Sequence, residues 1–169
     1  MDVLEAIKTR LENREFGKRP VPNDVKREIL EAGRLAPSGM NSQHWRFILV
    51  EDSKDLQTLA EISTTGKWVK DCDFAIIVLT TPKYPWHLLD AGRTITHMQM
   101  AAWNRGVGSR IYTGYDEKRM RQTFAIPGEY NISVVVGFGY PAKKVIGRKN
   151  RLPLEQVAYS HRFGNALKL

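Results

Sequence analysis

The chain has 169 residues, and its shares of hydrophobic residues (42%) and charged residues (26%) are ordinary for a soluble globular protein. No apolar run approaches the roughly 20 residues that a membrane-crossing helix needs, which excludes a membrane span. The single cysteine, Cys72, excludes an internal disulfide and fits a reducing compartment. We therefore expect one domain over residues 1–169, located in the cytoplasm and without a membrane partner.

The net charge of +8 is concentrated in two clusters of Lys and Arg, one near each end of the chain. The first cluster spans residues 8–19 and the second spans residues 143–151. Solvated surface is the usual meaning of such clusters, but a nucleic-acid footprint or a site for a small phosphate would have the same composition. Charge alone leaves these three interpretations open.

Hydrophobic periodicity predicts that helices and strands alternate along the first half of the chain. Asn23 is a plausible N-cap of the second helix, and Asp52 with Ser53 can cap the third. The run from Phe74 to Leu79 is continuously apolar, which is typical of a central strand that is covered on both faces. In chain order, the expected elements are a helix over 2–13, a helix over 23–33, a strand over 46–50, a helix over 53–63 and a strand over 74–79.

The longest helix is expected over residues 86–105. Apolar and small residues lie on most faces of this helix, so we expect it to be central or to be buried by a second subunit. Gly106 suits the position just past its end. A strand over 107–113, a short helix capped by Asp116 and a strand over 132–138 follow, after which the chain becomes basic and loop-like. The pattern favours an α+β or α/β domain with helices on both faces of a sheet.

One stretch, R-L-A-P-S-G-M-N-S-Q-H-W over residues 34–45, connects the second helix to the first strand. Pro37 disfavours helix at the residue before it, and Ser38, Gly39 and Asn41 favour turns. Polar loops that a rigid scaffold holds in place often carry binding sites. An ordinary helix–strand connection would have the same spacing, so the loop is a candidate site rather than an assigned one.

Several familiar kinds of site have no counterpart in the sequence. The four histidines are scattered and lack the short pairings of zinc sites, so we expect no metal. The G-x-S-x-G motif of serine hydrolases is absent. The G-x-G-x-x-A pattern at 137–142 follows a strand, but Pro141 removes a donor and no apolar helix follows. We interpret it as a strand end with a turn, not as a dinucleotide fingerprint.

The two basic clusters offer a more specific possibility. Arg10 and Arg14 are four residues apart, so they can share a helix face. Lys149 and Arg151 are two apart in an extended segment, so they would point the same way. Guanidinium groups bind phosphate with two hydrogen bonds. Together these four residues could clamp one phosphate group, with the loop over residues 37–41 as part of the wall.

Four motifs, in order along nearly the whole chain, make it similar to the FMN-dependent nitroreductase family. The family's R-x-S-x-R-x-F segment corresponds to R-L-E-N-R-E-F at 10–16, and its A-P-S-x-x-N-x-Q-P-W motif corresponds to residues 36–45. A long central helix with an Asp near its start, followed by G-[LVI]-G, corresponds to residues 90–108. The terminal G-x-P…R/K-x-R-x-P-L-E pattern corresponds to residues 137–155.

The resemblance implies an α+β fold, a three-layer sandwich with a mostly antiparallel central sheet flanked by helices. It also implies an intertwined homodimer with two FMN molecules at the subunit interface. Arg10, Lys149 and Arg151 would hold the phosphate, and Arg14 would lie near the pyrimidine edge of the ring. The other residues implied to bind the cofactor are Pro37, Ser38, Gly39 and Asn41 from the other subunit, Thr113 and Gly114 near the flavin N5, and Lys67.

The implied activity is hydride transfer from NADH or NADPH through flavin N5 to a small acceptor, such as a nitroaromatic, a quinone or oxygen, by a ping-pong mechanism. Flavin carries the chemistry, so no catalytic side chain is required. Arg14 and Lys67 would stabilise the charge of reduced flavin, and the Gly114 backbone would orient N5.

Two positions depart from the family pattern. Glu12 stands where the family has the serine that helps bind the phosphate, and a carboxylate there repels phosphate unless it turns outward or pairs with an arginine. His44 replaces the proline before the tryptophan. The region between Gly66 and Asp90 is also short, from which we expect an open pocket.

Two other functions remain open at this point. One keeps the fold and the flavin but has another reductive role, such as dehalogenation, use of a deazaflavin or flavin storage. The other is a basic nucleic-acid-binding module that uses both cationic clusters. We favour the flavin enzyme, with a second copy of the chain and small molecules as partners and no nucleic acid.

Overall fold

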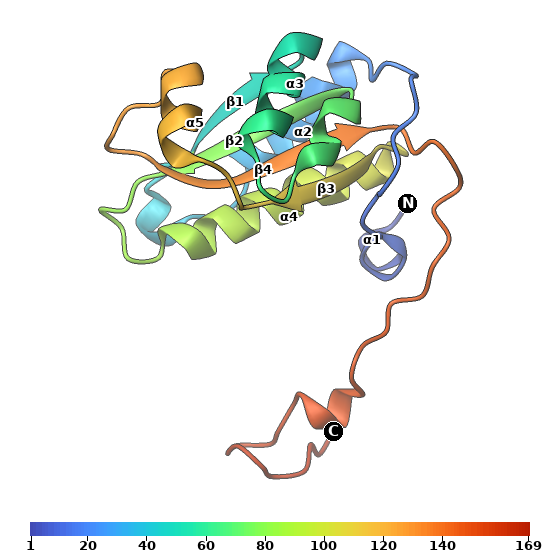
Figure 1. Ribbon diagram of the computed structural model, residues 1–169. Coiled ribbons are helices and arrows are strands. Elements are labelled where there is room, and N and C mark those ends of the chain that lie inside the picture. Colours follow the sequence, from blue (N-terminus) through green and yellow to red (C-terminus); the bar gives the residue numbers. More distant parts are fainter.

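The computed structural model describes residues 1–169 and contains a four-stranded antiparallel sheet with helices on both faces (Figure 1). The strand order is β1-β2-β4-β3, so the two central strands are not neighbours in the sequence. The strands are β1 (Arg46–Val50), β2 (Phe74–Thr80), β3 (Gly108–Tyr112) and β4 (Asn131–Gly139). The predicted α+β sandwich with an antiparallel central sheet is thereby confirmed.

Two layers of helices enclose this sheet. Residues of α2 and α4 form the core on one face, and residues of α3, η2 and α5 form the core on the other. The α-helices are α1 (Val3–Thr9), α2 (Asn23–Arg34), α3 (Ser53–Ile62), α4 (His87–Asn104) and α5 (Glu117–Thr123). The short 3-10 helices are η1 (Gly39–Asn41), η2 (Lys67–Asp71) and η3 (Leu154–Gln156).

Strand β2 explains why both layers are needed. Ala75, Ile77 and Leu79 lie in the core beneath α3 and α5, whereas alternate residues such as Phe74 and Ile76 lie in the core beneath α2 and α4. Side chains alternate between the two faces of a strand, and every residue of β2 is buried. The continuous apolar run therefore supplies two cores at once, as its composition predicts.

The predicted caps are confirmed at most helix ends. The Asp52 carboxylate accepts hydrogen bonds from the backbone amides of Lys54 and Asp55 in the first turn of α3, and the Asp116 carboxylate accepts one from the amide of Arg119 in the first turn of α5. Gly106 follows α4 with a φ of 73°, a conformation that glycine adopts without steric cost. Asn23, however, is the first residue of α2 and not its cap, because Pro22 occupies the cap position without a side-chain bond.

The first helix ends earlier than its periodicity predicts. It stops at Thr9, and the chain continues in extended form beside the edge of β3. Glu12 forms an isolated parallel bridge with Ser109, and the Asn13 N–H donates to the Ser109 carbonyl at 3.0 Å. Pairing with the sheet edge therefore replaces the last helical turn.

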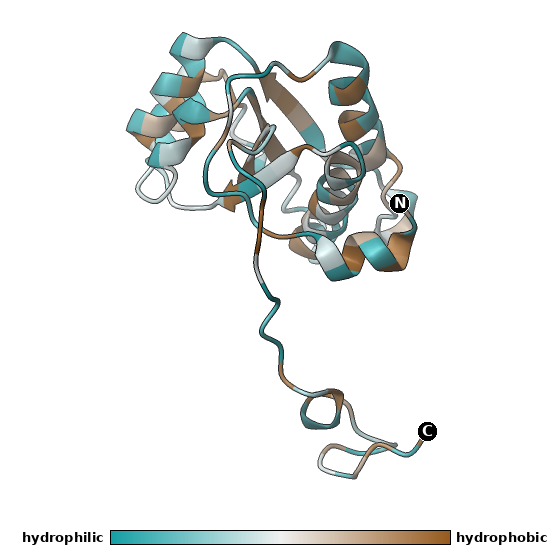
Figure 2. Cartoon of the chain, turned by 90° about the vertical axis from the view of Figure 1, so that its right-hand side faces the viewer, coloured by the Kyte–Doolittle hydropathy of each residue, from teal (hydrophilic) through white to brown (hydrophobic).

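The chain after β4 leaves the body of the molecule (Figures 1 and 2). Gly137–Gly139 pair with β2 and β3, so the G-x-G-x-x-A pattern is a strand end, as predicted. Residues 143–169 contain only η3 as regular helix or strand. Large apolar side chains of this segment are exposed, among them Leu152, Val157 and Phe163. None of the helices combines the length and the apolar character that crossing a membrane requires.

Candidate functional site

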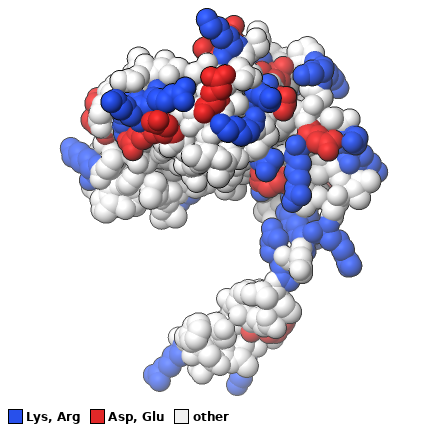
Figure 3. Space-filling model, in the orientation of Figure 1, with Lys and Arg blue, Asp and Glu red and all other residues white.

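The two basic clusters converge on one pocket. Arg10, Arg14, Lys149 and Arg151 all line a cavity of about 560 Å³, in which Glu12 is also present. In Figure 3, blue side chains gather where the terminal segment leaves the body. Residues from opposite ends of the sequence thus form a single cationic wall, as the clamp hypothesis expects.

Local contacts place two of the cations, Arg10 and Lys149, in this pocket. Arg10 follows the last residue of α1, and its backbone N–H donates to the Ala6 carbonyl at 2.9 Å. The Lys149 ammonium donates to the carbonyl of Ile7, which ties the terminal segment to α1. The end of the first helix therefore brings both cation-bearing segments together.

The charges in the pocket act on one another. The pKa of Lys149 is lowered from its usual value, first by burial and then by the positive charges of Arg10 and Arg151. The two guanidinium groups create a positive potential at Lys149, which contributes to the lower pKa. A bound anion would reduce this potential. The arrangement is therefore chemically suited to a phosphate group.

Glu12 partly neutralises this wall. Its carboxylate pairs with the Arg10 guanidinium at 2.7 Å, and the Gln99 amide of α4 lies 3.5 Å from the same oxygen. The Gln99 amide also donates to the Ser109 hydroxyl at 3.1 Å. The carboxylate is thus held by Arg10 and Gln99, the condition under which a carboxylate at this position is tolerable beside an anion.

The loop that carries Pro37, Ser38, Gly39 and Asn41 lies elsewhere in the chain. It packs against the start of α4, where the Gly39 N–H donates to the Asp90 carboxylate at 3.0 Å. The pocket lies near Gln99, nine residues farther along the same helix, or about 14 Å at the helical rise. One copy of the chain therefore does not place this loop in the wall of its own cationic pocket.

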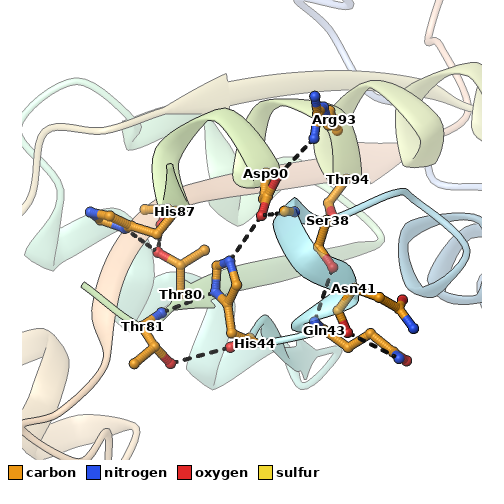
Figure 4. A network of polar contacts seen from close by, with 12 residues as sticks. Ser38, Asn41, Gln43, His44, Thr80, Thr81, His87, Asp90, Arg93 and Thr94 are labelled. Atoms are coloured by element: carbon orange, nitrogen blue, oxygen red, sulfur yellow. Dashed lines mark hydrogen bonds and ion pairs between the residues drawn. The ribbon is translucent and has the colours of Figure 1, made fainter. Parts of the chain in front are cut away.

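A buried carboxylate organises the loop (Figure 4). Asp90 has no exposed surface, and its Oδ2 contacts both the Gly39 N–H at 3.0 Å and the His44 Nε2 at 3.2 Å. Its other oxygen pairs with Arg93 at 3.0 Å. Because Asp90 lies in the first turn of α4, the helix dipole also favours its negative charge.

The segment between these two contacts is conformationally strained. Met40, Asn41 and Gln43 have positive φ angles of 54°, 52° and 46°. Each costs about 1 kcal/mol relative to an ordinary backbone conformation, with asparagine the best tolerated. Gly39 cannot be larger, because an added Cβ would lie 2.2 Å from the indole nitrogen of Trp86. The tertiary contacts of the loop therefore determine its shape.

Lys67, Thr113 and Gly114 form a third group, outside the cationic pocket. The Gly114 carbonyl accepts from the Thr64 N–H at 2.9 Å, and a Cβ on Gly114 would lie 2.2 Å from the Thr64 hydroxyl. Lys67 is exposed, and its ammonium donates to the Glu61 carbonyl at 3.3 Å. Trp68 of η2 packs edge-on against Tyr112 at the end of β3, with ring centroids 5.8 Å apart, and Lys67 and Thr113 are the chain neighbours of these two residues.

Several polar residues of these sites are not identifiable from motif spacing. Gln99 reaches the pocket from α4, and Thr64 borders Gly114. Thr81 binds the His44 ring through its backbone N–H at 3.3 Å. One signal was available: an acidic residue within the apolar face of a long helix, as Asp90 is, is seldom buried without partners. The structure contains no cluster of three or more His, Cys, Asp or Glu side chains that could hold a metal.

Comparison with known proteins gives a consistent result. The model of the nitroreductase family matches residues 7–76 and 64–140. A protein of Methanothermobacter thermautotrophicus, with the provisional name NADH dehydrogenase/NAD(P)H nitroreductase, is 35% identical over 152 residues, which are 85% of this chain and 79% of that protein. The iodotyrosine deiodinase of Thermotoga neapolitana is 25% identical over 164 residues, covering 82% and 88% of the two chains.

Solved structures share the fold. A crystal structure described as an oxidoreductase containing FMN superposes with a TM-score of 0.83 at 25% identity, covering 98% of this chain and 94% of that one. A nitroreductase from Bacteroides fragilis with bound FMN has a TM-score of 0.80 at 24% identity, covering 95% and 99%.

The crowding of positive charge generates a prediction for Lys149→Met. Because the native state lowers the pKa of this lysine, the protonated form is less favourable in the folded chain than in the unfolded chain at neutral pH. Removing the charge should leave the melting temperature of the free protein unchanged or slightly raised. Inorganic phosphate should bind about tenfold more weakly, because a charge-assisted contact is lost.

Melting curves with and without phosphate measure both effects. Lys70→Met serves as the matched control, because Lys70 is exposed in η2 and lies outside the pocket. A Lys149→Met protein that phosphate stabilises as much as the wild type would show that the pocket is not an anion site.

Proposed function

The chain belongs to the nitroreductase family, and from this premise we propose that it is an FMN-dependent oxidoreductase that uses NADH or NADPH to reduce a small acceptor. The acceptor would be a nitroaromatic, a quinone or oxygen, in a ping-pong reaction. The observation that carries the proposal is the convergence of Arg10, Lys149 and Arg151 on one pocket. Cations gathered this closely repel one another, and an anionic ligand would offset that repulsion.

The phosphate end of FMN fits the cationic pocket. Arg10 and Arg151 offer planar donors that match phosphate oxygens, and Lys149 adds a point charge that both of them influence. Arg14 lines the same pocket and would lie nearer the ring. Two carboxylates line the pocket, and each pairs with a cation: Glu15 with Lys143 at 3.1 Å and Glu12 with Arg10 at 2.7 Å. Glu12 is therefore the carboxylate that competes with phosphate for Arg10.

The group around Gly114 fits the edge of the ring. Gly114 is half-buried, and the Thr64 and Thr65 hydroxyls occupy the space that a Cβ would fill, whereas Thr64 and Thr65 as residues are exposed. Its N–H is the proposed donor to flavin N5. Arg14 and Lys67 would contribute positive charge near the pyrimidine, where negative charge develops on reduction. Bound FMN would supply a carrier that accepts a hydride from the nicotinamide and passes two electrons to the acceptor.

A second copy of the chain would complete the site. The loop over residues 37–41 and the cationic pocket lie toward opposite ends of α4, so two copies are needed to bring a loop to a pocket. Leu88 and Leu89 on α4 are each 59% exposed, and Phe163 in the terminal segment is 89% exposed. These exposed apolar side chains support an intertwined homodimer with a site at each interface.

The decisive experiment is a visible spectrum of the protein purified with FMN and then mixed with each nicotinamide. We expect a yellow protein that NADH or NADPH bleaches and that regains its colour when a quinone is added. Initial rates at several quinone concentrations should give parallel double-reciprocal lines. A colourless protein that does not take up FMN would contradict the proposal.

Two substitutions in the phosphate pocket should act in opposite directions. Arg10→Ala removes a direct phosphate contact and should weaken FMN binding by about tenfold or more, with little effect on folding. Glu12→Gln keeps the shape but removes the opposing charge, and should tighten binding about three- to fivefold, as expected for a partly exposed ion pair. Titration of flavin fluorescence measures both. Equal affinity in the two variants would contradict the assignment of this pocket.

The shared site can be tested by complementation. Arg10→Ala damages the phosphate pocket, and Asn41→Glu places a carboxylate on the loop that should cover the ring. Each variant alone should retain little FMN. Mixed dimers, refolded from the two variants together, should regain about half of the wild-type flavin, because one of their two sites combines an intact pocket with an intact loop. No recovery in isolated mixed dimers would mean that a single chain supplies both parts.

A second candidate keeps the flavin but changes the substrate. The similarity to the iodotyrosine deiodinase of Thermotoga neapolitana favours reductive dehalogenation as the alternative. A yellow protein that neither nicotinamide bleaches, but that chemical reductants do, would support this alternative over the first proposal.

A further inference from the structure

Asp90 binds both ends of the strained part of the loop. Its Oδ2 accepts from Gly39 at 3.0 Å and contacts His44 at 3.2 Å, and three of the five non-glycine residues with positive φ lie between these positions. Within the segment, the Gln43 N–H donates to the Ser38 hydroxyl at 3.0 Å. One buried carboxylate therefore closes the segment into a ring of contacts, which Figure 4 shows.

The contacts of His44 determine its tautomer. The Thr81 N–H lies 3.3 Å from Nδ1, and a backbone N–H can only donate, so Nδ1 is unprotonated. The proton is then on Nε2, which donates it to Asp90 at 3.2 Å. His44 therefore accepts from Thr81 through Nδ1 and donates to Asp90 through Nε2. The residue is 5% exposed, and its ring stacks on Tyr84 with centroids 5.1 Å apart, so the ring has little freedom to turn.

The two oxygens of Asp90 have different partners. Arg93 is the cation that pairs with Asp90, and it contacts Oδ1, which leaves Oδ2 for the loop. The Thr81 hydroxyl also lies 3.4 Å from the His44 carbonyl. A proline at position 44 would restrict the backbone but could make no bond to Asp90. In this chain, the hydrogen bonds of His44 therefore restrict the loop, whereas a proline would restrict it through its backbone.

We propose that His44 and Asp90 are positioning residues, which hold Ser38, Gly39 and Asn41 in the shape that covers the flavin in the dimer. This inference rests on the proposed function, because the loop matters to catalysis only if it meets the cofactor. Both side chains are buried, with exposed fractions of 5% for His44 and 0% for Asp90. Both act through the loop, whose strained conformation does not persist without their bonds.

Two substitutions of His44 separate its two hydrogen bonds. Glutamine can place an N–H where Nε2 lies and so keep the bond to Asp90, whereas asparagine can reach only the Nδ1 position and loses that bond. Asp90→Asn keeps the shape and removes the charge. Asp55→Asn is the matched control, because Asp55 is exposed on α3 and its carboxylate makes no hydrogen bond.

Hydrogen exchange of the Gly39 amide reports on the loop without any cofactor. This amide should be protected in the wild type, in His44→Gln and in Asp55→Asn. It should exchange about tenfold faster or more in His44→Asn and Asp90→Asn, because the loop end is released. Nitrogen NMR of the wild type should show an unprotonated Nδ1 and a protonated Nε2.

FMN affinity reports on what the loop does. His44→Asn should weaken FMN binding about tenfold, whereas His44→Gln should stay within about threefold of the wild type. If Asp90→Asn does not fold, the two His44 variants still decide the question. A protonated Nδ1, or a His44→Asn protein with wild-type Gly39 protection, overturns the proposed contacts.

The two proposals fail in different ways. A wild-type protein that binds no FMN overturns the proposed function and, with it, the role of the loop toward flavin. A wild type that binds FMN, beside a His44→Asn variant that binds it equally well, overturns this inference alone.

Discussion

The two-sided burial of β2 is the constraint on which the rest of the molecule depends. Its alternate side chains enter separate cores, so a helical layer must cover each face of the sheet. On one face α2 and α4 form that layer, and α4 is the longest helix of the chain. The position of α4 then fixes where its two ends, and the polar groups attached to them, can lie.

Helix α4 works as a rigid spacer between two half-sites. Asp90 near its start anchors the strained loop, and Gln99 farther along contacts the Glu12 carboxylate of the cationic pocket. Neither half resembles a complete cofactor site by itself. The first reason to propose a dimer is that the rigid helix α4 keeps the loop over residues 37–41 apart from the cationic pocket of the same chain. The second reason is that apolar side chains such as Leu88 and Phe163 are exposed.

The parts of the fold with a regular pattern could be predicted from the sequence. The apolar run of β2, the carboxylate caps Asp52 and Asp116, and Gly106 after α4 each have a local physical cause, and all are confirmed. The end of α1 was predicted wrongly, because a long-range contact overrides local helical periodicity. Glu12 pairs with Ser109, which lies far away in the sequence.

The candidate site divides in the same way. The convergence of Arg10 with Arg151 could be expected from composition and from the family resemblance, and the pocket contains both. The roles of His44 and Asp90 could not, because a buried ion network depends on which residues the tertiary fold brings together. Motif spacing readily identifies residues that contact a ligand. It seldom identifies residues whose role is to hold those ligand-binding residues in place. The ring-side assignments of Lys67, Thr113 and Gly114 stay predictions.

The extended segment after α1 has a consequence for the flavin-free protein. Besides bearing Arg10 and Glu12, it lies along β3, the outermost strand on its side of the sheet. An uncovered strand edge is a template for pairing with other molecules, and natural proteins shield such edges. Any ligand that steadies this segment would therefore also keep the edge closed. Loss of FMN would free this segment, uncover the edge of β3 and so favour self-association and precipitation. The solubility of the protein would therefore depend on the same backbone segment that binds the cofactor.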